Sequence, residues 1–136
     1  DDAMPGLSLA ARISENIASS QIFLLRHIMP TNVTEMSDLE KRIDGLREQN
    51  QKDSEEYSRT IVRADDRALF DKLQQTRSAY ATARARVFEL SRANKKAEAE
   101  SYNASTCRPA YENCQAAATT MFESNSKYGR RLPLKK

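Results

Sequence analysis

The sequence predicts an all-α fold, an antiparallel up-down-up-down four-helix bundle, and three observations support this prediction. Glycine and proline are scarce, with three and four residues in 136, whereas residue types that favour helices dominate the composition. Four long segments carry apolar residues at helical spacing. The breaks between them are short, and short connections between long helices require neighbours to run antiparallel. We take residues 1–136 as one domain.

The first predicted helix covers residues 7–29. Pro30 ends it because proline removes a backbone N–H and disfavours helical geometry in the preceding residue. His27 is the only histidine of the chain, and beside the Pro30 turn we expect it to be an ordinary exposed side chain. The apolar stripe of this helix consists of Leu7, Ala10, Ile17, Leu24 and Ile28.

The second predicted helix covers residues 33–63 and has two possible starts. Asn32 with Glu35, and Ser37 with Glu40, both match the pattern in which a side-chain oxygen accepts the N–H three residues further on. The inward stripe begins apolar and turns polar halfway along the helix. Its members are Met36, Leu39, Ile43, Leu46, Asn50, Asp53, Tyr57 and Thr60.

The third predicted helix covers residues 66–94. Asp65 and Asp66 suit its N-terminus because acidic groups there complement the helix dipole. Asn94 suits its end, since asparagine tolerates the left-handed conformation. The expected core positions are Leu69, Leu73, Thr76, Tyr80, Ala83, Val87 and Leu90.

The fourth predicted helix covers residues 97–128, Gly129 closes it, and residues 129–136 form a tail. Pro109 costs a hydrogen bond and should kink or loosen this helix. Cys107 and Cys114 should be free buried thiols, because seven helical residues rise about 10 Å, beyond the roughly 7 Å Cα separation that a disulfide allows.

Several classes of function lack their residues. We expect no enzyme activity, cofactor or metal, since a lone histidine offers no Ser-His-Asp or Glu-x-x-His arrangement and isolated glycines form no phosphate loop. Nucleic acid is not an expected partner, because a net charge of +3 comes from interspersed charges of both signs rather than a basic stripe. No apolar run reaches the roughly 20 residues of a transmembrane helix, so we expect any membrane anchor to lie outside this sequence.

The order of the segments carries a family resemblance. The hinge LLRHIMPTNVTEMSDLEKRI, the passage RSAYATARARVFELSRANKKAEAESY into the last helix, and Pro109 early in that helix are its main features. Together they resemble the four-helix-bundle ligand-binding domain of methyl-accepting chemotaxis proteins. The resemblance implies a non-catalytic sensor, a periplasmic domain of an inner-membrane protein, and a homodimer or higher oligomer with Arg26 at its interface or near a ligand. It also implies a signal carried by the last helix.

Two other functions remain open. The sensor domain of a histidine kinase could carry the same bundle. A soluble helical adaptor would instead bind a protein partner through an exposed apolar stripe, and no helix shows a clear second stripe in the sequence.

A polar layer across the bundle is the candidate ligand site. Arg77, Tyr80 and Arg84 share one face of the third helix, roughly 21 Å from its Asn94 end at 1.5 Å per residue. The same depth falls near Thr106, Arg108 and Tyr111 on the last helix, Arg47 and Asn50 on the second, and Asn16, Ser19 and Ser20 on the first. Arginine pairs with carboxylates bidentately, so the predicted ligand is a small di- or tricarboxylate. The resemblance to family members that sense organic acids implies one such as malate or citrate. The alternative is that these arginines reach solvent or pair with neighbouring acidic residues.

Overall fold

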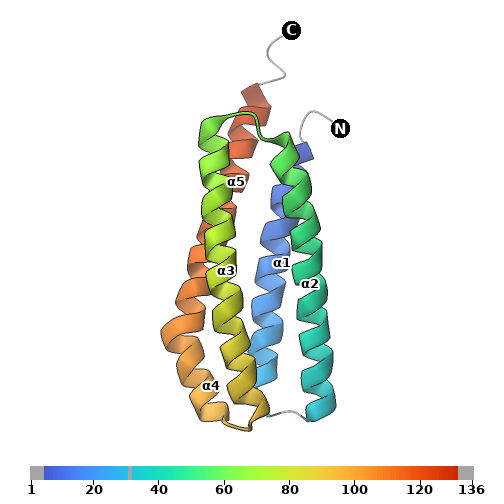
Figure 1. Ribbon diagram of the computed structural model, residues 1–136, viewed down its shortest axis with the longest axis vertical. Helices are drawn as coiled ribbons and strands as arrows, with labels where there is room; N and C mark the ends of the chain where they lie inside the picture. The colour runs from blue at the N-terminus through green and yellow to red at the C-terminus, as the bar shows by residue number, and fades with distance from the viewer. Residues whose placement is uncertain (1–4, 31, 132–136) are drawn as a thin grey trace.

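The protein is a bundle of four antiparallel rods in the computed structural model, which describes residues 5–30 and 32–131 (Figure 1). The first three rods are single helices: α1 (Pro5–Ile28), α2 (Val33–Thr60) and α3 (Ala64–Arg92). The fourth rod has three parts: α4 (Lys96–Tyr102), the π-helix η1 (Asn103–Cys107) and α5 (Arg108–Arg131). The described residues contain no strand, so the predicted all-α four-helix bundle is confirmed.

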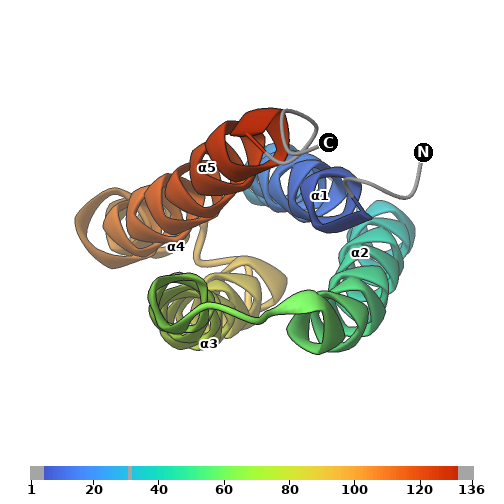
Figure 2. The ribbon, with the colours of Figure 1, turned by 90° about the horizontal axis from the view of Figure 1, so that it is seen from above.

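The rods do not pack with equal closeness. Seen along the bundle, α1 lies between α2 and α5, and α3 lies beside the fourth rod (Figure 2). By contrast, α2 and α3 touch at few points although they follow each other in sequence. The start of α1 and the end of α5 lie at the same end of the bundle (Figure 1). The side between α2 and α3 is therefore the one where the interior is least covered by packing.

Local sequence signals set the helix ends. Asn32 Oδ1 accepts the Glu35 N–H at 2.8 Å, so the first of the two possible starts of α2 is the one used. Asn94 has a φ of 62°, which is the left-handed conformation expected at the end of α3. The third helix begins two residues earlier than predicted, at Ala64, with Asp65 and Asp66 in its first turn.

The core runs along the bundle axis and includes both cysteines. Cys107 and Cys114 are fully buried and free, as predicted, and burial raises the pKa of each thiol to about 11. The other members of the core are mainly apolar side chains from α1, α3 and α5. They include Ile13, Ile17, Leu24, Leu73, Val87, Ala118 and Met121, together with Tyr57 and Tyr80.

The predicted fourth helix over residues 97–128 is interrupted, and the loosening expected at Pro109 takes the form of the π-helix η1. The Arg108 N–H bonds to the Asn103 carbonyl, five residues back rather than four, so the chain makes a wider turn there. Pro109 explains its position, because in an α-helix the proline ring would clash with the carbonyl four residues earlier. Gly129 does not close the rod, since α5 continues to Arg131. Residues 132–136 of the predicted tail lie outside the described part of the chain.

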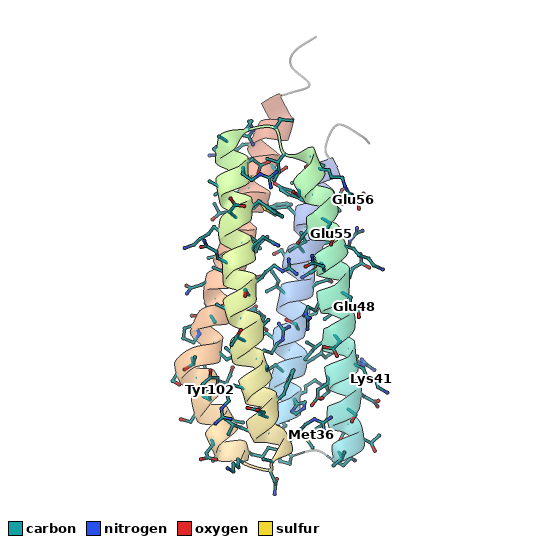
Figure 3. All side chains as sticks on the ribbon, viewed as in Figure 1. Met36, Lys41, Glu48, Glu55, Glu56 and Tyr102 are labelled. Atoms are coloured by element: carbon teal, nitrogen blue, oxygen red, sulfur yellow. The ribbon has the colours of Figure 1, made fainter. Side chains whose placement is uncertain are left out.

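The outer surface is mostly charged, although a few large apolar side chains are exposed, among them Val33 and Val62. Figure 3 shows Lys41, Glu48, Glu55 and Glu56 along the outer side of α2, and all four are exposed. On α1, however, three apolar side chains on one face are about half exposed: Ile22, Leu25 and Met29. The sequence-based view that no helix has a second apolar stripe is therefore wrong for α1. Within the described residues, no helix combines the length and apolarity needed to cross a membrane.

Candidate functional site

A cavity of about 220 Å³ lies midway along the bundle, on the side where α2 and α3 are loosely packed. Residues of α1, α2 and α3, with Cys114 of α5, form its wall. Three arginines lie on this wall: Arg47, Arg77 and Arg84. Among the described residues that line the cavity there is no aspartate or glutamate. The cavity therefore gathers positive charge with no carboxylate to balance it.

Arg77 is held at the cavity wall by neutral partners. Its guanidinium donates to Ser54 Oγ at 2.8 Å and to Gln74 Oε1 at 2.9 Å. Burial lowers the pKa of Arg77, and the nearby charges of Arg84 and Arg47 lower it further. A lowered pKa means that the surroundings of Arg77 disfavour its positive charge. A bound anion would instead favour that charge and raise the pKa.

Arg84 is the most deeply buried cation of the site. It is only 8% exposed, and its guanidinium carbon lies 4.7 Å from the centroid of the Tyr80 ring. No described carboxylate lies within ion-pairing distance of Arg84 or Arg77. A cation–π contact is worth about 2 kcal/mol when desolvated, whereas burying an unpaired charge costs several kcal/mol. Arg84 is thus under-compensated and ready to accept an anionic partner.

Tyr80 lines the cavity, and its hydroxyl contacts two residues of α1. This hydroxyl donates to Gln21 Oε1 at 2.7 Å and lies 3.1 Å from Ser20 Oγ. Burial raises the pKa of Tyr80 to about 12, so the group stays protonated at neutral pH and can serve as a donor. Behind it, the Tyr111 ring packs at 5.6 Å between centroids.

The remaining wall combines amides with apolar side chains. Asn16 Nδ2 donates to Asn50 Oδ1 at 3.0 Å, which joins α1 to α2 across the floor of the cavity. Ile17, Ile43 and Leu46 form an apolar wall. The cavity can therefore contact both the charged groups and the carbon skeleton of a small ligand.

The structure brings together most, but not all, of the predicted polar layer. Arg77, Tyr80 and Arg84 line the cavity, as do Arg47, Asn50, Asn16 and Ser20, which lie at the same depth; Ser19 does not. Three further polar residues escaped sequence reasoning: Gln51, Gln74 and Ser78. A signal was present on α3, because Gln74, Arg77, Ser78, Ala81 and Arg84 follow a helical stripe of their own beside the core stripe.

The residues predicted on the fourth rod are not part of this cavity. Arg108 is exposed and lines a separate groove with Leu25 and Met29 of α1. Thr106 is exposed, and its hydroxyl lies 3.1 Å from Ser105 Oγ. Counting depth fails here because Cys107 faces the core, and the next residue points about 100° away around a helix of 3.6 residues per turn. Tyr111 reaches the site only by packing against Tyr80.

Residues 1–133 match the family model of a four-helix bundle sensory module for signal transduction. The chain belongs to this family. No curated protein matches the sequence. Among the described residues of this sensory module, the buried histidine and aspartate groups outside the cavity have hydrogen-bonding partners.

One such group of the sensory module is His27, which is fully buried and not exposed as expected. Its Nε2 lies 2.7 Å from Glu40 Oε2, and its Nδ1 lies 2.8 Å from Ser91 Oγ. Lys96 donates to the His27 carbonyl at 2.8 Å, so four rods meet at this residue. Burial lowers the pKa of His27, and the bond to Glu40 opposes this only in part. The expectation failed because the end of α3 and the start of α4 cover the ring.

The second group is the pair Arg12–Asp53. The guanidinium donates twice to the carboxylate, at 2.8 Å in each bond, and Asp53 is 1% exposed. The bonds from Arg12 lower the pKa of Asp53. Arg26, by contrast, is exposed beside Met29 and Arg42, and does not line the cavity.

Proposed function

We propose that this sensory module is the periplasmic ligand-binding domain of a bacterial transmembrane chemoreceptor, and that it binds a small di- or tricarboxylate between α1, α2 and α3. The observation that carries the proposal is the cavity with Arg47, Arg77 and Arg84 and no carboxylate among its described lining residues. Arg84 is buried and Arg77 is half-buried, and such arginines without an acidic partner are costly unless an anion completes them, whereas Arg47 is exposed and adds positive charge to the lining.

The ligand would replace weak partners with strong ones. Arg77 now bonds to the neutral groups of Ser54 and Gln74, and Arg84 lies on the Tyr80 ring. A carboxylate offers each arginine charge-assisted hydrogen bonds, about twice as strong as neutral ones. With about 30 Å³ for each water, the cavity holds about seven waters, which is room for a ligand the size of malate or citrate.

The charge of the lining favours acids over amino acids. An amino acid carries an ammonium group, which would need an acceptor and would be repelled by the three arginines. No acidic side chain of the described lining could pair with that ammonium. Malate, succinate and citrate are therefore expected to bind in preference to aspartate.

Signal transmission follows from where the termini lie. Because α1 starts and α5 ends at the same end of the bundle, both can connect to membrane segments there. A ligand shifts the fourth rod only if it binds two conformations with different affinity. Small helix displacements of this kind belong to the known repertoire of switching proteins.

A homodimer is part of the proposal. The exposed apolar face of α1, formed by Ile22, Leu25 and Met29 with Arg26 beside them, fits a second copy of the chain. A soluble adaptor would use the same face for another protein, so this observation also supports the second candidate function. Sedimentation velocity of the wild type and Leu25→Glu separates the two: only the homodimer predicts self-association that the substitution abolishes.

Calorimetric titration tests the carboxylate site. We expect malate, citrate or succinate to bind with a Kd in the micromolar to millimolar range, about −8 to −4 kcal/mol, and aspartate to bind more weakly. Arg84→Ala should remove the binding. Arg86→Ala is the matched control, since Arg86 lies on the same helix but is exposed and pairs with Glu89. If none of the acids binds, the carboxylate proposal is wrong.

A further inference from the structure

A chain of buried side chains connects the cavity to the π-helix of the fourth rod. Tyr80, on the cavity wall, donates to Gln21 Oε1 at 2.7 Å. Gln21 Nε2 in turn donates to Asn103 Oδ1 at 3.4 Å. Gln21 and Asn103 are 7% and 4% exposed, and Asn103 is the first residue of η1. The polar path therefore runs from α3 through α1 into the only π-helix of the described residues.

Compared with a regular α-helix, the π-helix adds one residue between two positions of the fourth rod that face the core. From Cys107, the last residue of η1, to Cys114 and Met121 of α5, successive buried positions are separated by seven residues, which is about two turns of an α-helix. From Ala99 to Cys107, both fully buried, the separation is eight residues. The wide turn of η1 absorbs the extra residue and keeps both flanks facing the core.

Two influences set the conformation of this segment. Pro109 favours the wide turn, because in a regular helix its ring would clash with the Ser105 carbonyl. The amide of Asn103 is fixed by Gln21, which itself is oriented by Tyr80. Converting this segment to a regular α-helix would move the extra residue to another position along the helix. A shift by one residue corresponds to about 1.5 Å of rise and about 100° of rotation.

We propose that η1 is the conformational element that ligand binding switches, with Gln21 and Asn103 as the positioning residues that couple it to the cavity. The proposal rests on the proposed function of the cavity. A bound carboxylate competes with Gln21 for the Tyr80 hydroxyl and draws Arg84 away from the Tyr80 ring. Gln21 and Asn103 then lose the hydrogen bonds that orient them, and η1 can convert, which displaces α5.

Hydrogen exchange of the full chain tests the coupling without any ligand. Gln21→Ala should speed exchange of the amides in residues 103–108 by about tenfold, with residues 36–46 of α2 unchanged. Gln115→Ala is the matched control, because Gln115 is a half-buried glutamine of α5 that bonds only to Ser14. The coupling is overturned if Gln21→Ala leaves residues 103–108 within twofold of the wild type, or if the control gives the same local acceleration.

The same measurement with malate, citrate or succinate tests the switch. In the wild type a bound acid should change exchange across residues 103–108 by fivefold or more. Gln21→Ala should keep the affinity within fivefold and lose this response. If an acid binds but exchange of the segment is unaltered, the switch is wrong and the proposed function stands. If no acid gives heat, the proposed function fails, and the ligand-free comparison decides the coupling.

A one-residue deletion tests the spare residue directly. Removing exposed Ser105 in the Pro109→Ala background, where no proline ring opposes a regular helix, should give a protein that folds with a Tm within about 5 °C of Pro109→Ala. The deleted protein should show no exchange response to the acid. A drop of more than 5 °C relative to Pro109→Ala would show that the wide turn is required for packing, and would overturn the proposed conversion.

Discussion

Two arginine sites lie side by side in this bundle and differ in the partners of their arginines. Arg12 forms two bonds with Asp53, while Arg77 donates to Ser54, the next residue of α2. One turn of helix therefore offers a carboxylate to the first arginine and only a hydroxyl to the second. Arg84 has no acidic partner among the described residues either.

The difference separates structural charge from charge available for binding. Asp53 is almost fully buried and already neutralised, so Arg12 has nothing to gain from a ligand. Arg77 and Arg84 are held by neutral groups around an open cavity. Removing an arginine should therefore harm stability in the first site and affinity in the second.

The largest expected effect is on affinity at the open site. Arg84→Ala should weaken binding of the best acid by about 100-fold or more, since bonds to a buried charge are worth about 3 kcal/mol. Titration calorimetry measures this, with Arg86→Ala expected to stay within twofold of the wild type. An unchanged Kd for Arg84→Ala would place the ligand elsewhere.

The second prediction concerns stability, which should change in opposite directions when an arginine is replaced in each of the two sites. Arg12→Ala should cost about 3 kcal/mol, because it leaves Asp53 buried with only Gln49 as a side-chain partner. Arg84→Met should instead stabilise the ligand-free protein by about 1 kcal/mol, because it removes an unpaired buried charge. Urea unfolding of both variants checks the pair, and two losses of equal size would contradict the comparison.

A smaller effect is expected at the tyrosine between the two arginines. Tyr80→Phe should weaken acid binding by about fivefold, equivalent to one hydrogen bond of about 1 kcal/mol. Tyr111→Phe is the control, because Tyr111 packs against Tyr80 but does not line the cavity. Equal losses in the two variants would indicate an effect of packing rather than of the Tyr80 hydroxyl.

The smallest effect concerns His27, a buried histidine. Its pKa is lowered in the folded protein, so below about pH 6.5 the unfolded chain binds more protons and stability falls as the pH decreases. Asp53 and Glu40 also have lowered pKa values, but their contribution is lost only below about pH 4.5. Melting curves between pH 7.5 and 5 should slope for the wild type and be flatter for His27→Gln.

The features predicted correctly from the sequence are those that depend on residues close together along one helix. Asn32 fixes the start of α2 through its side-chain oxygen, and Asn94 ends α3 through its left-handed backbone. The face shared by Arg77, Tyr80 and Arg84 follows from helical spacing. Those signals are local, so they need no knowledge of the other rods.

What failed depends on contacts between rods. His27 is covered by residues of α2, α3 and α4 that are distant in sequence. Arg108 was assigned to the site by depth alone, while its direction depends on how η1 presents the following helix. The partner of Arg77 could not be predicted either. Asp53 and Ser54 are adjacent on α2, and only the packing of the rods decides that Asp53 faces Arg12 of α1 while Ser54 faces Arg77 of α3.

The two cysteines have a practical consequence for following α5. Both thiols are fully buried, and their pKa is raised to about 11, so very little reactive thiolate is present at neutral pH. A maleimide probe should therefore ignore them and attach to a cysteine introduced at an exposed position such as Thr119. Native Cys107 and Cys114 can stay in place while fluorescence or spin labels record distances between the rods.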